Sequence, residues 1–155
     1  MLNRVYEMIM PSIQESLEVP YAVEKMYDLV NDIEAYSEFL PGCTESKIVR
    51  QEEDSIQAKL TFSGGGFSKA FTTSNRLQKN KMIKISLVNG PFRQLEGFWA
   101  FEPTKKGCKV RLSLEFEFAS HLLAFAFSPV FEQVAHKLIH AFSERAKQQY
   151  GKRLN

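Results

Sequence analysis

Hydrophobic and polar residues alternate with a period of two over most of the chain between residues 44 and 118. Such alternation is typical of strands that bury one face and expose the other. Short runs of turn-forming residues, at 64–66, 79–80 and 89–91, divide the pattern into segments. The pattern therefore predicts six consecutive antiparallel strands, at residues 44–52, 56–62, 67–77, 83–87, 95–101 and 109–118.

A seventh strand and two short helices are predicted ahead of this region. Residues 12–19 alternate, and the residues on one face are Ile13, Glu15, Leu17 and Val19. Pro20 ends this strand and stands just before a predicted helix at 21–31, where a proline is tolerated. Asp32 is a suitable cap for a second, short helix at 33–38.

A long amphipathic helix is predicted at the end of the chain, from residue 121 to 150. Pro129 predicts a break or a new first turn within it. Its apolar stripe recurs at spacings of three and four and consists of Phe131, Val134, Ala135, Leu138 and Phe142.

Together these elements predict an α+β fold, with a seven-stranded antiparallel sheet and one long helix across its apolar face. One helix is a narrow cover for seven strands, so we expect the sheet to curl around it. The enclosed space is then filled either by phenylalanines or by a ligand. We assign residues 10–155 to this single domain and residues 1–9 to an N-terminal extension outside it.

The composition is that of an ordinary globular domain: 155 residues, of which 44% are hydrophobic and 25% charged. The formal net charge of +2 is too small to predict DNA binding. Residues 144–155 carry four basic side chains against one glutamate. This basic end is either a solvated helix end that suits the helix dipole or a contact for RNA or an anionic membrane.

Cysteine usage and hydropathy indicate the compartment. Cys43 and Cys108 lack the spacing of metal ligands, so we expect reduced thiols. No secretory signal is recognisable, and no apolar run reaches the roughly 18 residues needed to span a bilayer. We therefore expect a cytoplasmic protein whose contact with the inner membrane, if any, is peripheral.

An apolar loop, Phe39-Leu40-Pro41, stands between the predicted short helices and the next strand. Three apolar residues in a row at a loop need cover. The loop therefore either plugs the open end of the curled sheet or acts as a gate that a ligand or membrane covers. Phe125 and Phe127 are a second candidate for a gate or a membrane contact.

Two charged residues fall on apolar faces: Arg145 in the helical stripe and Glu15 in the first strand. A charge in such a place must be paired or reach water. Arg145 either extends to solvent near the helix end or pairs with Glu15 at one end of a cavity. Such a pair would orient the polar head of a ligand.

No catalytic or metal-binding set is recognisable. His136 and His140 have the i, i+4 spacing of helical metal ligands, but they fall opposite the apolar stripe, which predicts a solvated pair. Cys43 has no histidine near it in the sequence to act as a base. We therefore predict no catalytic residue and no metal.

An ordered set of short motifs spans about residues 10–150. The motifs are Val19-Pro20-Tyr21, residues 26–32, Tyr36, residues 39–44, residues 71–73, residues 87–92, residues 116–118, and Ala141-Phe142 with Arg145-Ala146. In this order they resemble the START-like helix-grip family, in its coenzyme Q-binding and polyketide cyclase-like branch. Within that branch the chain is most similar to the bacterial ribosome association toxins. Gly42 stands where coenzyme Q-binding relatives often carry a tryptophan, which favours the toxin group.

The resemblance implies a sheet that grips the C-terminal helix around an apolar tunnel. It implies a non-enzymatic protein that binds ubiquinone or another isoprenoid lipid, or that binds the large ribosomal subunit and blocks its association with the small one. The gate would be Phe39, Leu40 and Pro41, and Arg145 with Glu15 would orient the ligand. The tunnel wall would consist of Phe71, Trp99, Phe116, Phe118, Val134, Leu138 and Phe142.

Three alternatives to a ribosome-directed ligand-binding protein stay open. A ubiquinone-binding protein would support respiration. A cyclase- or dehydratase-like enzyme would use the same cavity, with Arg145 and Glu15 as its only inward charges. A structural domain with a filled core would bind nothing inside.

Overall fold

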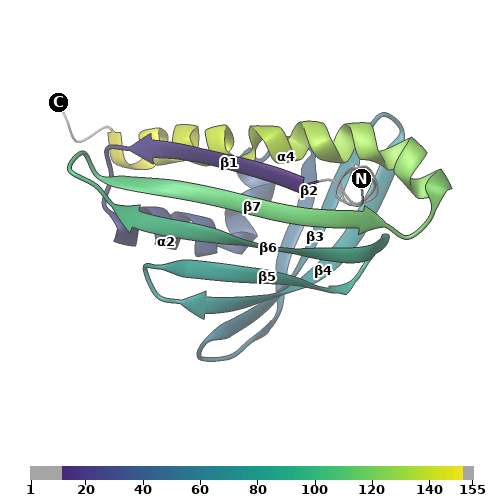
Figure 1. The fold of residues 1–155 in the computed structure, drawn as a ribbon, viewed down its shortest axis with the longest axis horizontal. Helices are drawn as coiled ribbons and strands as arrows, with labels where there is room; N and C mark the ends of the chain where they lie inside the picture. Colours follow the sequence, from purple (N-terminus) through teal and green to yellow (C-terminus); the bar gives the residue numbers. More distant parts are fainter. Residues whose placement is uncertain (1–11, 152–155) are drawn as a thin grey trace, which may run out of the picture.

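The computed structural model describes residues 12–151, in which seven strands form one antiparallel sheet (Figure 1). From β2 to β7 each strand pairs with the next along the chain, and β1 returns to pair with β7, giving the order β1-β7-β6-β5-β4-β3-β2. The predicted fold class and all seven strands are confirmed. The strands are β1 (Ser12–Val19), β2 (Cys43–Gln51), β3 (Ser55–Gly64), β4 (Phe67–Gln78), β5 (Met82–Asn89), β6 (Phe92–Pro103) and β7 (Cys108–Phe118).

Three helical segments lie between β1 and β2: α2 (Val23–Asn31), η1 (Ile33–Ala35) and α3 (Tyr36–Phe39). The long helix α4 (His121–Tyr150) follows β7 and runs the length of the sheet beside β1 (Figure 1). The last turn of α4 reaches α2, because the Tyr150 hydroxyl donates to the Lys25 carbonyl at 3.3 Å. This hydrogen bond joins the C-terminal turn of α4 to the first turn of α2.

Two local predictions about helix ends are wrong. Asp32 makes no side-chain capping hydrogen bond; its backbone N–H instead donates to the Leu29 carbonyl and closes α2. Helix α4 is continuous through Pro129. Proline removes the hydrogen bond to the carbonyl of Phe125, but both residues are exposed, so water can take the place of the missing N–H.

Aromatic rings fill the space between the first half of α4 and the sheet. Phe131 of α4 lies with its ring centroid 5.2 Å from that of Phe92, 4.7 Å from that of Phe116 and 6.0 Å from that of Phe118. Most of these pairs are edge-to-face, an arrangement that adds to the gain from burial. This aromatic cluster fixes α4 over β6 and β7.

The buried stripe of α4 differs from the predicted one. Val134 and Leu138 are only half-buried, and Val134 lies against the loop at Gly42, where a Cβ atom would come within 3.4 Å of its Cγ2. Ile139, which was not predicted, is buried in their place. The buried residues of the helix are Phe127, Phe131, Ala135, Ile139, Phe142 and Ala146.

The curl of the sheet brings β6 unusually close to β7 at Gly97. A Cβ atom at this position would lie 2.0 Å from the Ser113 carbonyl oxygen and 3.0 Å from the Leu114 Cα. Both are backbone atoms and cannot rotate away. Glycine inside a strand often marks such a close approach.

We expect Gly97→Ala to lower the free energy of unfolding by roughly 1–3 kcal/mol, the usual cost of forcing extra atoms into a packed site. Denaturant unfolding measures the change. Glu96→Ala is the matched control, because Glu96 is the exposed neighbour of Gly97 and its loss should cost less than about 0.5 kcal/mol. Equal stability of the two variants would show that the close approach does not constrain the sheet.

Candidate functional site

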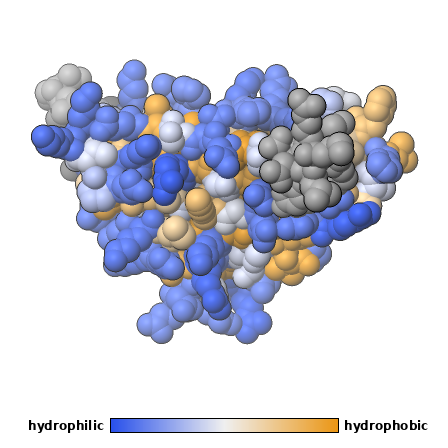
Figure 2. All heavy atoms as spheres, in the orientation of Figure 1, coloured by the Kyte–Doolittle hydropathy of each residue, from blue (hydrophilic) through white to orange (hydrophobic). Residues whose placement is uncertain are grey.

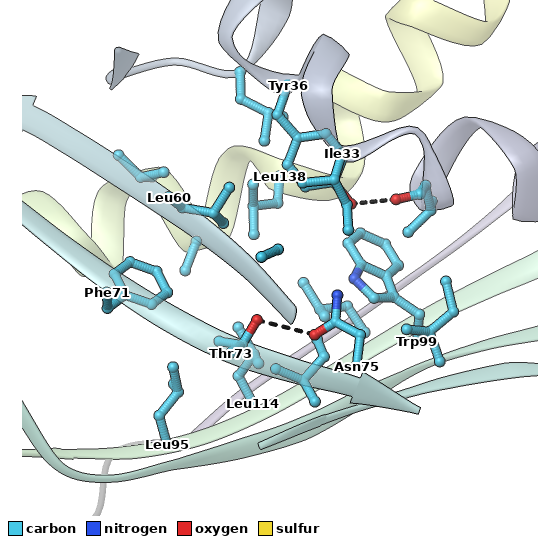
Figure 3. Close-up of a pocket in the computed structure, with 18 of the residues that line it drawn as sticks. Ile33, Tyr36, Leu60, Phe71, Thr73, Asn75, Leu95, Trp99, Leu114 and Leu138 are labelled. Carbon is cyan, nitrogen blue, oxygen red and sulfur yellow. Dashed lines mark hydrogen bonds between the residues drawn. The ribbon is translucent and has the colours of Figure 1, made fainter. Parts of the chain in front are cut away.

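A cavity of about 90 Å³ lies between the concave face of the sheet, α4 and the segment that contains α2, η1 and α3 (Figure 3). Strands β3 to β7 all contribute to its wall. None of the described residues that line it is charged. The cavity is therefore suited to an apolar, neutral occupant.

The volume limits what the cavity holds in this conformation. An apolar cavity of about 150 Å³ is enough for one benzene molecule, so a larger ring needs more room than this. The lining side chains that are only half-buried, and are therefore least restrained, are Leu60, Ile85, Val134 and Leu138. Movement of these side chains would enlarge the cavity without disrupting the aromatic cluster around Phe131.

The predicted tunnel wall is partly assembled here. Phe71, Trp99, Val134, Leu138 and Phe142 all line the cavity. Phe116 and Phe118 are not among the lining residues; they pack against Phe131, which is one of them. That any of these residues contacts a ligand stays a prediction.

Two polar residues of the wall, Thr73 and Asn75 in β4, were not predicted. Both are buried, and the Thr73 hydroxyl donates to the Asn75 side-chain oxygen at 2.9 Å (Figure 3). The signal for them was present in the sequence, because they continue the inward alternation that starts at Phe71. Their polar character concealed them in a search for apolar stripes.

The predicted gate residues take three different positions. Leu40 is buried and lines the cavity, whereas Pro41 is exposed. Phe39 is half-buried beside α4, with its ring centroid 5.1 Å from that of Phe142. Only Leu40 therefore borders the cavity directly, with Phe39 supporting the wall from outside.

Of the two alternatives for Arg145, the pair with Glu15 is wrong. Arg145 Nη2 lies 2.9 Å from Glu38 Oε1 of α3, and its guanidinium lies 5.1 Å from the centre of the Phe39 ring. Glu15 instead meets His136, with Nδ1 and Oε1 2.8 Å apart. His136 and Arg145 are nine residues apart, about 13 Å along the helix axis, so one carboxylate cannot reach both.

Neither Arg145 nor Glu15 lines the cavity. The two contacts instead attach α4 at its rim, to α3 through Arg145 and to β1 through His136. His136 is exposed as predicted, but it is paired with Glu15 rather than simply solvated. Within residues 12–151, no group of three or more His, Cys, Asp or Glu side chains is placed to hold a metal ion.

The thiols are buried and held in the protonated form. Burial raises the pKa of both Cys43 and Cys108 from 9.0 to about 11. Burial also raises the pKa of Tyr36, whose hydroxyl donates to the Val30 carbonyl. A protonated, buried thiol is a poor nucleophile, so Cys43 lacks the properties of a catalytic cysteine.

Apolar surface is exposed where α4 begins, at the end of the molecule on the right of Figure 2. Leu122 is 77% exposed and Phe125 is 86% exposed, whereas Phe127, predicted to accompany Phe125, is buried. By length and composition α4 is apolar enough to cross a membrane. Here it is the core helix of the domain, with one face packed on the sheet.

Comparison with known proteins gives the family. A family model described as polyketide cyclase / dehydrase and lipid transport matches residues 19–143. This chain belongs to that family. Its fold is START-like: a START superfamily protein from Mycobacterium smegmatis superposes with a TM-score of 0.75 at 20% identity, covering 89% of this chain and 98% of the other. The Zhui aromatase/cyclase from Streptomyces sp. R1128 superposes with a TM-score of 0.78 at 13% identity, covering 90% and 95%.

Two relatives in sequence bear on function. The ribosome association toxin RatA of Escherichia coli K12 is 43% identical over 148 residues, which cover 95% of this chain and 94% of the toxin. The mitochondrial coenzyme Q-binding protein COQ10 homolog B of Xenopus laevis is 27% identical over 143 residues, covering 89% and 59%. The toxin is thus similar over almost the whole of this START-like chain.

The buried thiols of this START-like domain should make it less stable at alkaline pH. Their raised pKa means that the unfolded state loses these protons first, so their contribution is fully present below pH 9 and is lost as the pH rises towards 11. We expect the midpoint of urea unfolding to fall over this range. The double variant Cys43→Ala, Cys108→Ala should lose less stability over the same range; an identical loss would contradict a role for the thiols.

The contact between Arg145 and Glu38 should couple α4 to α3. A double-mutant cycle with Arg145→Met and Glu38→Gln should give a coupling energy of about 0.2–1 kcal/mol at low salt, since Glu38 is largely exposed. Salt at 1 M should remove most of it. The exposed Arg50–Glu52 pair, at 2.7 Å, is the control and should couple more weakly. A coupling no larger than in that pair would rule out the attachment.

Proposed function

We propose that this protein is a non-enzymatic, RatA-like START domain that binds a hydrophobic ligand and limits the association of ribosomal subunits. The observation that carries the ligand-binding part is the uncharged cavity between the sheet and α4. Burial of an apolar tail there would contribute roughly 25 cal/mol per Å² before the costs of ordering. The ligand class we propose is isoprenoid, with ubiquinone as one member.

Entry of such a ligand requires the cavity to enlarge. The half-buried side chains of Leu60, Val134 and Leu138 would move first, and Phe39 would follow if α3 shifts away from Arg145. The remaining wall is fixed by the aromatic cluster and by the sheet. Binding would therefore displace α3 and the neighbouring side of α4 rather than the strands.

The proposal that the protein acts on ribosomes rests on its similarity to proteins named as ribosome association toxins. A protein named as a ribosome association toxin is 43% identical over nearly the whole chain. The basic end of α4, where Lys147 is exposed in the last turn, is the surface we assign to the contact, because cationic side chains bind the phosphates of RNA.

Two other functions receive weaker support. The relative named as coenzyme Q-binding, at 27% identity, favours a quinone-binding role in respiration. The likeness to an aromatase/cyclase favours an enzyme, but among the described lining residues Tyr36 is the only titratable one. Its hydroxyl is engaged by the Val30 carbonyl. The cavity therefore offers no group suited to acid–base catalysis.

Two measurements on the purified protein test the proposal. Mass spectrometry of extracted lipids should find a neutral isoprenoid compound, and addition of the protein to ribosomes should shift sedimentation from joined particles to separate subunits. Lys147→Glu should reduce the shift, whereas the matched change Lys84→Glu, on the exposed side of β5, should not. Quinone without any ribosomal shift would favour the respiratory role. A protein that carries no ligand and leaves the sedimentation profile unchanged would overturn both parts.

A further inference from the structure

Two nitrogen donors face the cavity without an acceptor. The first is the side-chain amide of Asn75, which is 9% exposed and points into the open space in Figure 3. The Thr73 hydroxyl donates to the amide oxygen, which leaves the NH₂ group turned towards the cavity. No described residue accepts a hydrogen bond from it.

The second donor is the indole N–H of Trp99. Trp99 is 5% exposed, and its ring packs edge-on against Phe142 with centroids 5.1 Å apart. Figure 3 shows its nitrogen on the cavity side of the ring. Unlike Arg145 Nε, which protein atoms enclose completely, neither the Asn75 nor the Trp99 nitrogen is sealed off from an occupant.

Such donors are unusual in an apolar wall, because a buried polar group without a partner costs about 1–3 kcal/mol. An occupant that brings an acceptor would recover this cost. Both groups are donors only, so they select an acceptor oxygen rather than a hydroxyl that must also donate. Among residues 12–151 no cation faces the cavity to neutralise a carboxylate or phosphate, which disfavours a charged head.

We propose that Asn75 and Trp99 together bind a carbonyl oxygen, so that the cavity selects neutral apolar compounds that carry a ketone or quinone carbonyl. Thr73 acts as a positioning residue, since its hydroxyl holds the Asn75 amide oxygen and leaves the NH₂ group on the cavity side. This inference rests on the proposed ligand-binding function and names the chemistry that the ligand must have. Prenylated quinones and free aromatic ketones share that chemistry.

The test uses probes that differ only in the carbonyl group. Heptanophenone and heptylbenzene have nearly the same shape, and equilibrium dialysis against the purified protein measures the affinity for each. We expect heptanophenone to bind about tenfold more tightly, the value of one good hydrogen bond inside a protein. A charged probe of similar length, 7-phenylheptanoate, should bind more weakly than either.

Decylubiquinone tests whether the natural ligand is a quinone. Tighter binding than heptanophenone assigns the site to quinones, and weaker binding assigns it to free ketones.

The variants assign the preference to the named residues. The double variant Thr73→Val, Asn75→Leu removes both partners of the hydrogen bond together, so neither is left unpaired. It should bind both phenyl probes alike, because the carbonyl no longer meets a donor from β4. Trp99→Phe should remove part of the preference. Ser74→Ala, at the adjacent outward-facing position of β4, is the control and should keep it.

The outcomes separate this inference from the proposed function. Equal binding of the two phenyl probes by the wild-type protein would overturn the carbonyl site and leave hydrophobic binding intact. Retention of the preference in the double variant would overturn the assignment to Asn75. Failure of every probe to bind, decylubiquinone included, would overturn the ligand-binding function itself.

Discussion

The cover of a seven-stranded sheet by a single helix is the constraint on which the rest of this structure depends. A flat sheet of this width would leave much of its apolar face in water, so the sheet curls until the 30 residues of α4 can close it. The close approach of β6 and β7 at Gly97 is one local result of that curl. The enclosed volume exceeds what the aromatic cluster around Phe131 fills, and the remainder is the cavity.

The side chains that attach α4 to the rest of the domain lie outside the cavity. Arg145 with Glu38 and His136 with Glu15 hold α4 at its rim, where Glu38 and His136 still reach water. The part of the cavity wall that residues 12–151 form is uncharged. Its polar groups come from β4, β6 and α3, and that of α3, the Tyr36 hydroxyl, is already engaged by the Val30 carbonyl.

The fold was predictable from the sequence because apolar and polar residues alternate along most strands. Residues 109–118 alternate without a fault, and β7 buries all five of the apolar positions in that run. Hydrogen bonding at Asp32 and the path of the helix at Pro129 were harder to predict, because more than one arrangement was available at each. Asp32 was an equally good candidate for a side-chain cap and for a backbone link to Leu29, and Pro129 could be accommodated because its face of α4 meets water. Such choices depend on neighbours that a linear pattern does not contain.

The site was only partly predictable for the same reason. Phe71, Trp99 and Phe142 were accessible to sequence reasoning, since large apolar residues on inward positions must meet in the core. The partner of Arg145 was not, because the rise of the helix decides whether Glu15 or Glu38 lies within reach. Asn75 and Thr73 escaped attention because polar residues in a strand usually indicate solvated positions, although both continue the inward alternation from Phe71.

The pairing of β1 with β7 has a consequence for how the chain folds as it is made. Ser12 lies opposite Glu115, so β1, the first of the described strands, pairs with a strand that lies about a hundred residues later in the chain. Until β7 emerges, β1 has no neighbour in the sheet, and α4 emerges later still. Strand pairs that close such long loops form slowly, because the entropy of the loop is lost before any contact is gained. Strands β2 to β6 can pair as they appear, whereas the cavity does not exist until synthesis of the domain is nearly complete.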